Sequence, residues 1–297
     1  MEIIGVDNGY GLTKTAHCDF VTALTNNGTV KPPFLENAIE YNGNYYLIGG
    51  ERMKVMEDKT ENQNTYILTI AAIAEELSLR GLHEADILLS VGLPLERCGT
   101  GAKAFSEYFK KEETESFLYK GNPYKIRIPK VLVSPQGYSA IVGMIKDIPD
   151  GTVLVDIGSW TIDISQIIGG IPQKNLSLND GVINCILTVN DAIRRETGNE
   201  VMEAQIQNIM RCKPDVLPEK YTIIARREIQ AYAEKIAATL QEYKFNLETL
   251  PFVFVGGGAT IIKNFGMHLF PNAKVITDIH ANAKGYEEIA KQVCRRG

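Results

Sequence analysis

The sequence predicts an α/β protein made of two duplicated domains. Two segments of the same pattern support this prediction, one at residues 3–14 and the other at residues 153–164. In each segment an apolar strand leads into an aspartate, a glycine-containing turn and a second strand. The two segments lie about half a chain apart, and a length of 297 residues suits about two domains. We therefore expect the duplication of one α/β unit.

The composition is that of an ordinary globular protein, with 44% apolar and 23% charged residues. The net charge of −5 disfavours a broad, non-specific grip on nucleic acid, so we expect any contact with DNA to run through another protein. No apolar run approaches the ~18 residues of a membrane span, and the chain opens on a strand without a basic-then-apolar leader. Five scattered cysteines without a CxxC pair indicate reduced thiols. These features favour a cytoplasmic protein that does not contact membranes.

The first domain is expected over residues 1–148, beginning with a hairpin that turns at residues 8–11. Its other strands are predicted at residues 45–48, 86–92 and 125–133. Helices are predicted at residues 66–79, where apolar residues recur at helical spacing, and at 136–147, between Pro135 and Pro149. The polar residues 112–125 are expected to form an exposed loop or edge.

The second domain is expected over residues 149–280, after the breaker cluster at residues 147–151. Its strands are predicted at residues 152–156, 161–167, 252–255 and 275–276. A long amphipathic helix is predicted at residues 224–243. A closing helix is expected at about residues 281–297, packing back onto the first domain. Small residues at 281, 283 and 285 indicate close packing against another helix at the domain junction.

The first candidate site is the turn that follows Asp7. Glycines at 9 and 11 would let backbone N–H groups approach phosphate oxygens, and the Lys14 ammonium could reach a phosphate as a point charge. Asp7, at the end of a buried strand, suits Mg²⁺, which prefers one or two carboxylates plus substrate oxygens. The alternative is an ordinary type I′ hairpin turn at Asn8 and Gly9.

The second candidate site repeats this arrangement at Asp156, Ile157 and Gly158. Asp156 could face Asp7 across a cleft, with the metal ion between the two carboxylates. Thr161 and Asp163 follow on the outgoing strand, where a carboxylate in apolar surroundings is costly unless it is paired or lies near a metal. The roles of Asp163 and of the only tryptophan, Trp160, are left open.

Three further segments are candidates for ligand contacts. Gly256, Gly257 and Gly258 follow a strand and precede a helix, which allows a close approach to the adenosine and α-phosphate of a nucleotide. Gln136, at a predicted helix start, could orient a water for in-line attack on a γ-phosphate, or could be an ordinary helix-start residue. Gly181 belongs to a turn that either contacts ribose or phosphate or is a turn only.

In their order along the chain, these segments resemble the five motifs of the actin, Hsp70 and sugar-kinase superfamily of ATPases. Within it, the chain most resembles the actin-like proteins of the ParM type, which segregate plasmids. The details that carry this resemblance are Asp7–Gly11 with Lys14, Pro135–Gly137, Asp156–Ser159 with Thr161 and Asp163, and Ala281–Tyr286. The resemblance implies two actin-like (ribonuclease H-like) domains flanking a nucleotide cleft.

The resemblance also implies roles for single residues. Asp7 and Asp156 would position Mg²⁺ through water, and Gln136 would place the attacking water. The implied nucleotide contacts, made with ATP or GTP, come from Asn8, Gly9, Tyr10, Gly11, Lys14, Gly158, Ser159, Thr161, Gly181, Gly256, Gly257 and Gly258. The implied activity is Mg-dependent ATP hydrolysis by a head-to-tail filament. A DNA-binding adaptor at a plasmid centromere-like site would be the second partner.

Chain length separates members of this superfamily. The chain has no room for the substrate domain of an Hsp70-type chaperone, and it shows no clear catalytic aspartate of a sugar kinase. A filament-forming ATPase that drives plasmid DNA segregation is therefore the leading hypothesis. A non-polymerising ATPase, acting as a small-molecule kinase or an ATP sensor, is the alternative.

Overall fold

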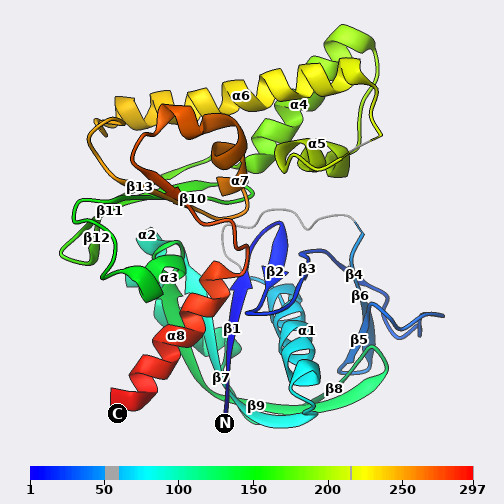
Figure 1. Cartoon of the computed structure of the whole chain (residues 1–297). Helices are drawn as coiled ribbons and strands as arrows, with labels where there is room; N and C mark the ends of the chain where they lie inside the picture. Colours follow the sequence, from blue (N-terminus) through cyan, green and yellow to red (C-terminus); the bar gives the residue numbers. More distant parts are fainter. Residues whose placement is uncertain (51–59, 215, 297) are drawn as a thin grey trace. The chain divides into compact units, whose positions relative to one another are not determined.

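The computed structural model describes residues 1–50, 60–214 and 216–296 (Figure 1). Contacts divide the chain into two compact units. Unit 1 comprises Met1–Gly143 with His280–Gly297, and unit 2 comprises Met144–Ile279. Residue 297, the last of the predicted closing helix, lies outside the described residues. Within the described part of the chain, no helix is both long and apolar enough to cross a membrane.

Unit 1 contains a nine-stranded sheet in the order β3-β2-β1-β7-β9-β8-β5-β6-β4. Its strands are β1 (Glu2–Asn8), β2 (Leu12–Lys14), β3 (Asp19–Val21), β4 (Leu24–Asn26), β5 (Ala38–Tyr41), β6 (Asn44–Ile48), β7 (Glu84–Leu93), β8 (Lys111–Tyr119) and β9 (Asn122–Pro135). The central strands β1, β7 and β9 run parallel. Parallel strands end at the same edge of a sheet, so the segments that follow β1 and β9 are brought close together.

Helices cover both faces of this parallel core. The even-numbered β1 residues Ile4 and Val6 join the apolar cluster formed with α1 (Asn64–Leu79) and α2 (Leu95–Phe109). Gly5 faces the other way, toward α8 (Ala281–Arg296), because successive side chains of a strand point to opposite faces. Figure 1 shows α8, in red, lying along β1 and β7 although it ends the chain.

Unit 2 contains a five-stranded sheet in the order β12-β11-β10-β13-β14. Its strands are β10 (Val153–Ile157), β11 (Ile162–Ile168), β12 (Ile171–Leu178), β13 (Phe252–Val255) and β14 (Ala273–Val275). Its helices are α4 (Val182–Thr197), α5 (Glu203–Met210), α6 (Glu219–Glu242) and α7 (Ala259–Ile261), the last of which runs into a π-turn at Ile262–Gly266. The central β10 is antiparallel to β11 and parallel to β13.

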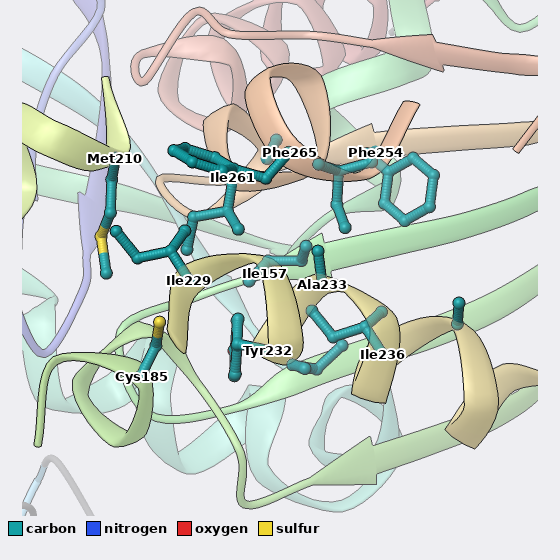
Figure 2. Close-up of a cluster of buried hydrophobic side chains, with 14 of the residues drawn as sticks. Ile157, Cys185, Met210, Ile229, Tyr232, Ala233, Ile236, Phe254, Ile261 and Phe265 are labelled. Carbon is teal, nitrogen blue, oxygen red and sulfur yellow. The ribbon is translucent and has the colours of Figure 1, made fainter. Parts of the chain in front are cut away.

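The core of unit 2 lies between this sheet and its helices. Figure 2 shows Ile157 of β10 and Phe254 of β13 beside one stripe of α6 that carries Ile229, Ala233 and Ile236. The spacing of this stripe, three to four residues, keeps the side chains on one face of the helix. Residue alternation along β10 therefore sends Asp156 to the sheet face opposite α6.

Several predicted elements are confirmed by the structure. The predicted strand at residues 252–255 is β13, and the predicted helix at residues 66–79 is α1 with two residues added at its start. The closing helix begins at Ala281 as expected.

Two predicted elements are wrong. The helix expected at residues 136–147 is reduced to α3 (Tyr138–Ile141) and a 3₁₀ turn at Val142–Met144. Gly137 adopts φ +70°, which is incompatible with a helix, and Gly143 weakens the other end. The exposed loop or edge expected at residues 112–125 is instead β8 and the start of β9, inside the sheet. Its polar side chains alternate with the buried Phe117 and Tyr119.

Candidate functional site

Three predicted site residues of unit 1 lie in direct contact. The Lys14 Nζ is 2.8 Å from Asp7 Oδ2, and Gln136 Nε2 donates a hydrogen bond to Asp7 Oδ1 at 3.0 Å. Asp7 is 2% exposed. The pairing of β1 with β2 sets Lys14 directly opposite Asp7, and Gln136 follows β9 at the same sheet edge. The sheet therefore gathers residues 129 positions apart into one polar cluster.

The charges of this cluster are complementary. A buried carboxylate is costly unless a cation or hydrogen-bond donors offset it, and Lys14 and Gln136 provide both for Asp7. The Gln136 amide must direct its NH₂ group at Asp7, since the carboxylate accepts only. Its carbonyl oxygen is then the atom that can accept a hydrogen bond from a water molecule.

The turn after Asp7 is a three-residue loop, Gly9–Gly11, and not a two-residue hairpin turn. The type I′ alternative at Asn8 and Gly9 is wrong, because neither residue has the positive φ that it requires. Gly9 donates its N–H to Asp7 O at 2.9 Å, and a Cβ on Gly9 would lie 2.6 Å from Leu12 O. Only glycine fits this position, for reasons internal to the loop. Tyr10 and Gly11 complete the loop.

Two threonines that the sequence reading missed support this loop. Thr22 Oγ1 donates to Gly9 O at 2.7 Å, and Thr69 Oγ1 of α1 donates to Asn8 Oδ1 at 3.1 Å. Thr69 is fully buried on α1. The threonine hydroxyl within a predicted helix could have indicated this contact from the sequence, since a buried polar group needs a hydrogen-bond partner.

In unit 2, the predicted site residues form a second compact group. Asp156 and Asp163 are directly paired across β10 and β11, and Thr161 Oγ1 donates to Asp163 Oδ2 at 3.0 Å. Like charges directly opposite each other on a sheet are destabilising unless a donor or cation compensates. The sequence left the role of Asp163 open, and the structure places this residue beside Asp156.

The start of α4 closes the turn that contains Gly158 and Ser159. Val182 N and Ile183 N donate to Gly158 O and Ser159 O, both at 3.0 Å, so the helix holds the turn through its first backbone amides. Gly158 N itself donates to Thr161 O at 2.9 Å.

Gly181, just before α4, packs directly on this turn. Its N–H donates to Trp160 O at 2.9 Å, and a Cβ there would lie 2.5 Å from the backbone of Ser159 and Trp160. Tyr232 of α6 fixes the neighbouring residue by donating its hydroxyl to Asp180 O at 2.6 Å. The turn at residues 179–181 therefore supports the loop of Gly158 structurally, whether or not it also meets a ligand.

The three glycines after β13 have different surroundings. A Cβ on Gly256, which has φ +85°, would lie 2.3 Å from Asp156 Oδ1, and a Cβ on Gly258 would lie 2.2 Å from Ile157 Cγ2. Gly257 is exposed, and no heavy atom comes within 4 Å of its added Cβ. Two of the three glycines are thus required by close packing, and Gly257 is the one with open space for a ligand.

Asp7 belongs to unit 1 and Asp156 to unit 2, so their convergence on one metal ion stays a prediction. Across residues 1–50, 60–214 and 216–296, no group of three or more His, Cys, Asp or Glu side chains forms a metal site. Mg²⁺ does not need one, because it binds through one or two carboxylates, substrate phosphates and water. The two aspartates, each at a strand end beside a turn, are donors that fit this ion.

Two family models match successive parts of the chain. Residues 5–138 match the N-terminal domain of actin-like proteins, and residues 154–266 match the C-terminal domain of the archaeal actin homologue MreB-like family. The first match contains Asp7, Lys14 and Gln136, and the second contains Asp156 and the three glycines. The chain belongs to the actin-like proteins.

Solved structures of actin-like proteins share this fold. Ta0583, an archaeal actin homolog, is 21% identical over 98% of this chain and all of its own, with a TM-score of 0.81. Bacillus thuringiensis ParM with ATP is 16% identical over 99% of both chains, with a TM-score of 0.72. The Alp12 filament structure is 14% identical over 99% of both chains, with a TM-score of 0.70. No curated protein sequence matches the chain.

These likenesses establish the two-domain actin-like fold that the sequence predicts. Identities this low say nothing further about what an actin-like protein of this sequence does. Ta0583 has also been solved as a complex with ADP, at 22% identity and a TM-score of 0.76.

Proposed function

We propose that this actin-like protein is a Mg-dependent ATPase that assembles into head-to-tail filaments and drives the segregation of plasmid DNA. The observation that carries the proposal is the contact of Lys14 and Gln136 with the buried Asp7. It gathers a cation for phosphate, a carboxylate for a metal ion and an amide for water at one sheet edge. The structures of ParM with ATP and of the Alp12 filament, which share the fold, support the choice.

Each residue of the cluster has a separate task in this proposal. The Lys14 ammonium has three donors, so it can bind a phosphate oxygen while it contacts Asp7. Gln136, held by Asp7, orients a water through its carbonyl oxygen. Asp7 and Asp156 would hold Mg²⁺ through water, and the bound ion would neutralise phosphate charge. Gly257 offers the open backbone along which an adenosine could lie.

Filament formation is proposed from the family and from the physics of repeated contacts. A head-to-tail contact between identical subunits does not close on itself, so it produces a filament. Nucleotide hydrolysis would weaken that contact and make the filament unstable. An adaptor protein bound to a plasmid centromere-like site would couple the filament to DNA in the cytoplasm. An adaptor is needed because the net charge of −5 disfavours direct binding of DNA by the chain itself. The proposal keeps the domain limits of 1–148 and 149–280. It also keeps GTP as a second possible nucleotide.

Light scattering and pelleting with and without Mg-ATP test this function. A filament former shows nucleotide-dependent scattering above a critical concentration, and electron microscopy of the pellet should show filaments. A small-molecule kinase or ATP sensor stays dispersed, and a kinase consumes ATP only when an acceptor is added. Dispersed protein at high concentration with saturating Mg-ATP would contradict the polymerising function.

Two substitutions test the assigned chemistry. Asp156→Ala should abolish phosphate release, and an unchanged release rate would refute the role of Asp156. Gln136→Ala should slow turnover by at least about tenfold while ATP binding is preserved. If Gln136→Ala instead abolished ATP binding, Gln136 would be a structural residue.

A further inference from the structure

We propose that Asn282, on the closing helix α8, is the positioning residue that holds Gln136 in place for ATP hydrolysis. This inference rests on the proposed function, because it assigns Asn282 a task in the same reaction. Asn282 acts through the backbone of the residue that follows Gln136. The contact lies wholly within unit 1, which contains both Gln136 and α8.

The backbone at Gln136 has an unusual conformation. Gly137 has φ +70° and ψ −60°, and Tyr138 N donates to Gln136 O at 2.7 Å across it. These are the angles and the hydrogen bond of the positive-φ γ-turn, which glycine adopts without the Cβ clash that other residues would meet. Because glycine has many other backbone conformations open to it, contacts from the surroundings must select this one. The direction of the Gln136 side chain depends on this turn, because it fixes the backbone on one side of the residue.

Two hydrogen bonds hold the turn from outside. Gln136 N donates to Leu93 O of β7 at 2.8 Å, and Gly137 N donates to Asn282 Oδ1 at 2.9 Å. Gly137 is buried, and Asn282 is 7% exposed. A buried backbone N–H without an acceptor costs about 1–3 kcal/mol, so removing the Asn282 oxygen would favour a different backbone path at Gly137.

The helix that carries Asn282 is itself fixed against the sheet and α3. A Cβ on Gly285 would lie 1.8 Å from Ser139 O, which shows how closely α8 and α3 pack. Ser90 Oγ of β7 donates to Tyr286 O at 3.0 Å. Asn282 is therefore presented to Gly137 from a rigid support, and its Oδ1 is the atom that meets the amide.

The consequence concerns turnover and not nucleotide binding. Gln136 is tied to Asp7 at one end and to the γ-turn at the other, so a shift of the turn displaces the amide that orients the water. A misplacement of about 1 Å in a reacting arrangement can cost on the order of a hundredfold in rate. Asp7 lies on β1 and Lys14 on β2, and neither depends on Asn282, so phosphate binding should persist.

The test compares phosphate release and the affinity for a fluorescent ADP analogue in full-length variants. Asn282→Ala should lower kcat by about tenfold to a hundredfold, while KM for ATP and Kd for the ADP analogue change by less than about twofold. Asn282→Asp should restore kcat to within about threefold of the wild type. Aspartate keeps an acceptor oxygen for Gly137 N–H, and its charge is favourable near the N-terminus of α8.

Two controls separate positioning from loss of structure. Ser90→Ala removes another buried hydrogen bond between α8 and the sheet without touching Gly137, so its kcat should stay near the wild-type value. In the Gln136→Ala background, Asn282→Ala should lower kcat no further, because a residue that acts through Gln136 has nothing left to position. Hydrogen exchange at the Gly137 amide should accelerate in Asn282→Ala and slow again in Asn282→Asp.

The outcomes distinguish this inference from the proposed function. A wild-type protein that releases no phosphate with Mg-ATP overturns the proposed function, and the positioning role falls with it. A wild type that hydrolyses ATP, together with an Asn282→Ala variant of normal kcat, overturns the role of Asn282 alone. Equal loss of kcat in Asn282→Ala and Asn282→Asp, or an additive loss in the double variant, also overturns it.

Discussion

Gly256 and Gly257 are neighbours in one loop, yet their substitution by alanine should have opposite effects. Gly256 has φ +85°, and a Cβ there would lie 2.3 Å from Asp156 Oδ1 and 2.6 Å from Ile157 O. Gly257 lacks a positive φ, and its added Cβ would meet nothing within 4 Å. Comparing Gly256→Ala with Gly257→Ala therefore separates the effect of backbone strain and steric overlap from the effect of adding a methyl group alone.

The expected magnitude follows from two costs that add at Gly256. An L-residue in the left-handed region costs about 1–2 kcal/mol, and forcing extra volume against fixed atoms costs about 1–3 kcal/mol. Gly256→Ala should thus lower the free energy of unfolding by about 2–5 kcal/mol. Gly257→Ala should change it by less than about 1 kcal/mol, with stabilisation expected because alanine restricts the unfolded chain.

Urea unfolding followed by tryptophan fluorescence measures this difference. The chain has one tryptophan, Trp160, and it lies in unit 2 with both glycines, so its signal reports on the relevant unit. Equal unfolding midpoints for the two variants, or a lower midpoint for Gly257→Ala, would refute the reasoning. Gly257→Ala should instead weaken binding of the ADP analogue, since the added methyl group occupies the open side of the loop.

Two further substitutions in unit 1 test its polar and small-residue contacts by thermal unfolding. Burial alone would raise the pKa of Glu76, but hydrogen bonds from Thr15 and His17 outweigh it and lower the pKa below its ordinary value of 4.5. A carboxylate with a lowered pKa stabilises the fold above pH 4.5, and this contribution is lost as pH falls through the folded-state pKa. Glu76→Gln should therefore lower Tm at pH 7 and flatten the decline of Tm below pH 4.5. An unchanged dependence of Tm on pH in the acid range would contradict this. Gly285→Ala should cost more than about 1 kcal/mol, because its Cβ would overlap Ser139 O, and a Tm equal to that of the wild type would show that α3 and α8 can separate freely.

Asp7, Lys14 and Gln136 could each be singled out from the sequence as site residues, and they meet in unit 1 through geometry that is local or set by sheet topology. Asp7 and Lys14 are opposite each other in a hairpin of consecutive strands, which alternation and turn residues reveal. Gln136 follows a parallel strand, and such strand ends meet at one edge. The two elements that set this geometry, the β1–β2 hairpin and β9, were expected close to where the structure has them.

The contact of Asn282 with Gly137 was out of reach of such reasoning. It joins residues 145 positions apart, and it depends on a γ-turn at a place where the proline spacing favoured a long helix. Periodicity describes repeating elements, whereas a single buried amide that needs an acceptor leaves no periodic trace. The prediction of an exposed loop or edge at residues 112–125 was wrong for another reason: strands with one solvent-facing side carry many polar residues.

The glycines illustrate why a motif can be recognised for one reason and retained for another. Sequence reasoning offered each glycine as a point where a phosphate or adenosine could come close, with an ordinary turn as the alternative at Gly9 and Gly181. In the structure Gly9, Gly181, Gly256 and Gly258 each leave less than 3.0 Å for a Cβ against the protein itself. Substitutions at these four positions should lower stability whatever the ligand. At Gly257 an added Cβ meets nothing within 4 Å, so an alanine there can report on nucleotide binding without a stability loss, and the proposed adenosine contact can be judged at this position.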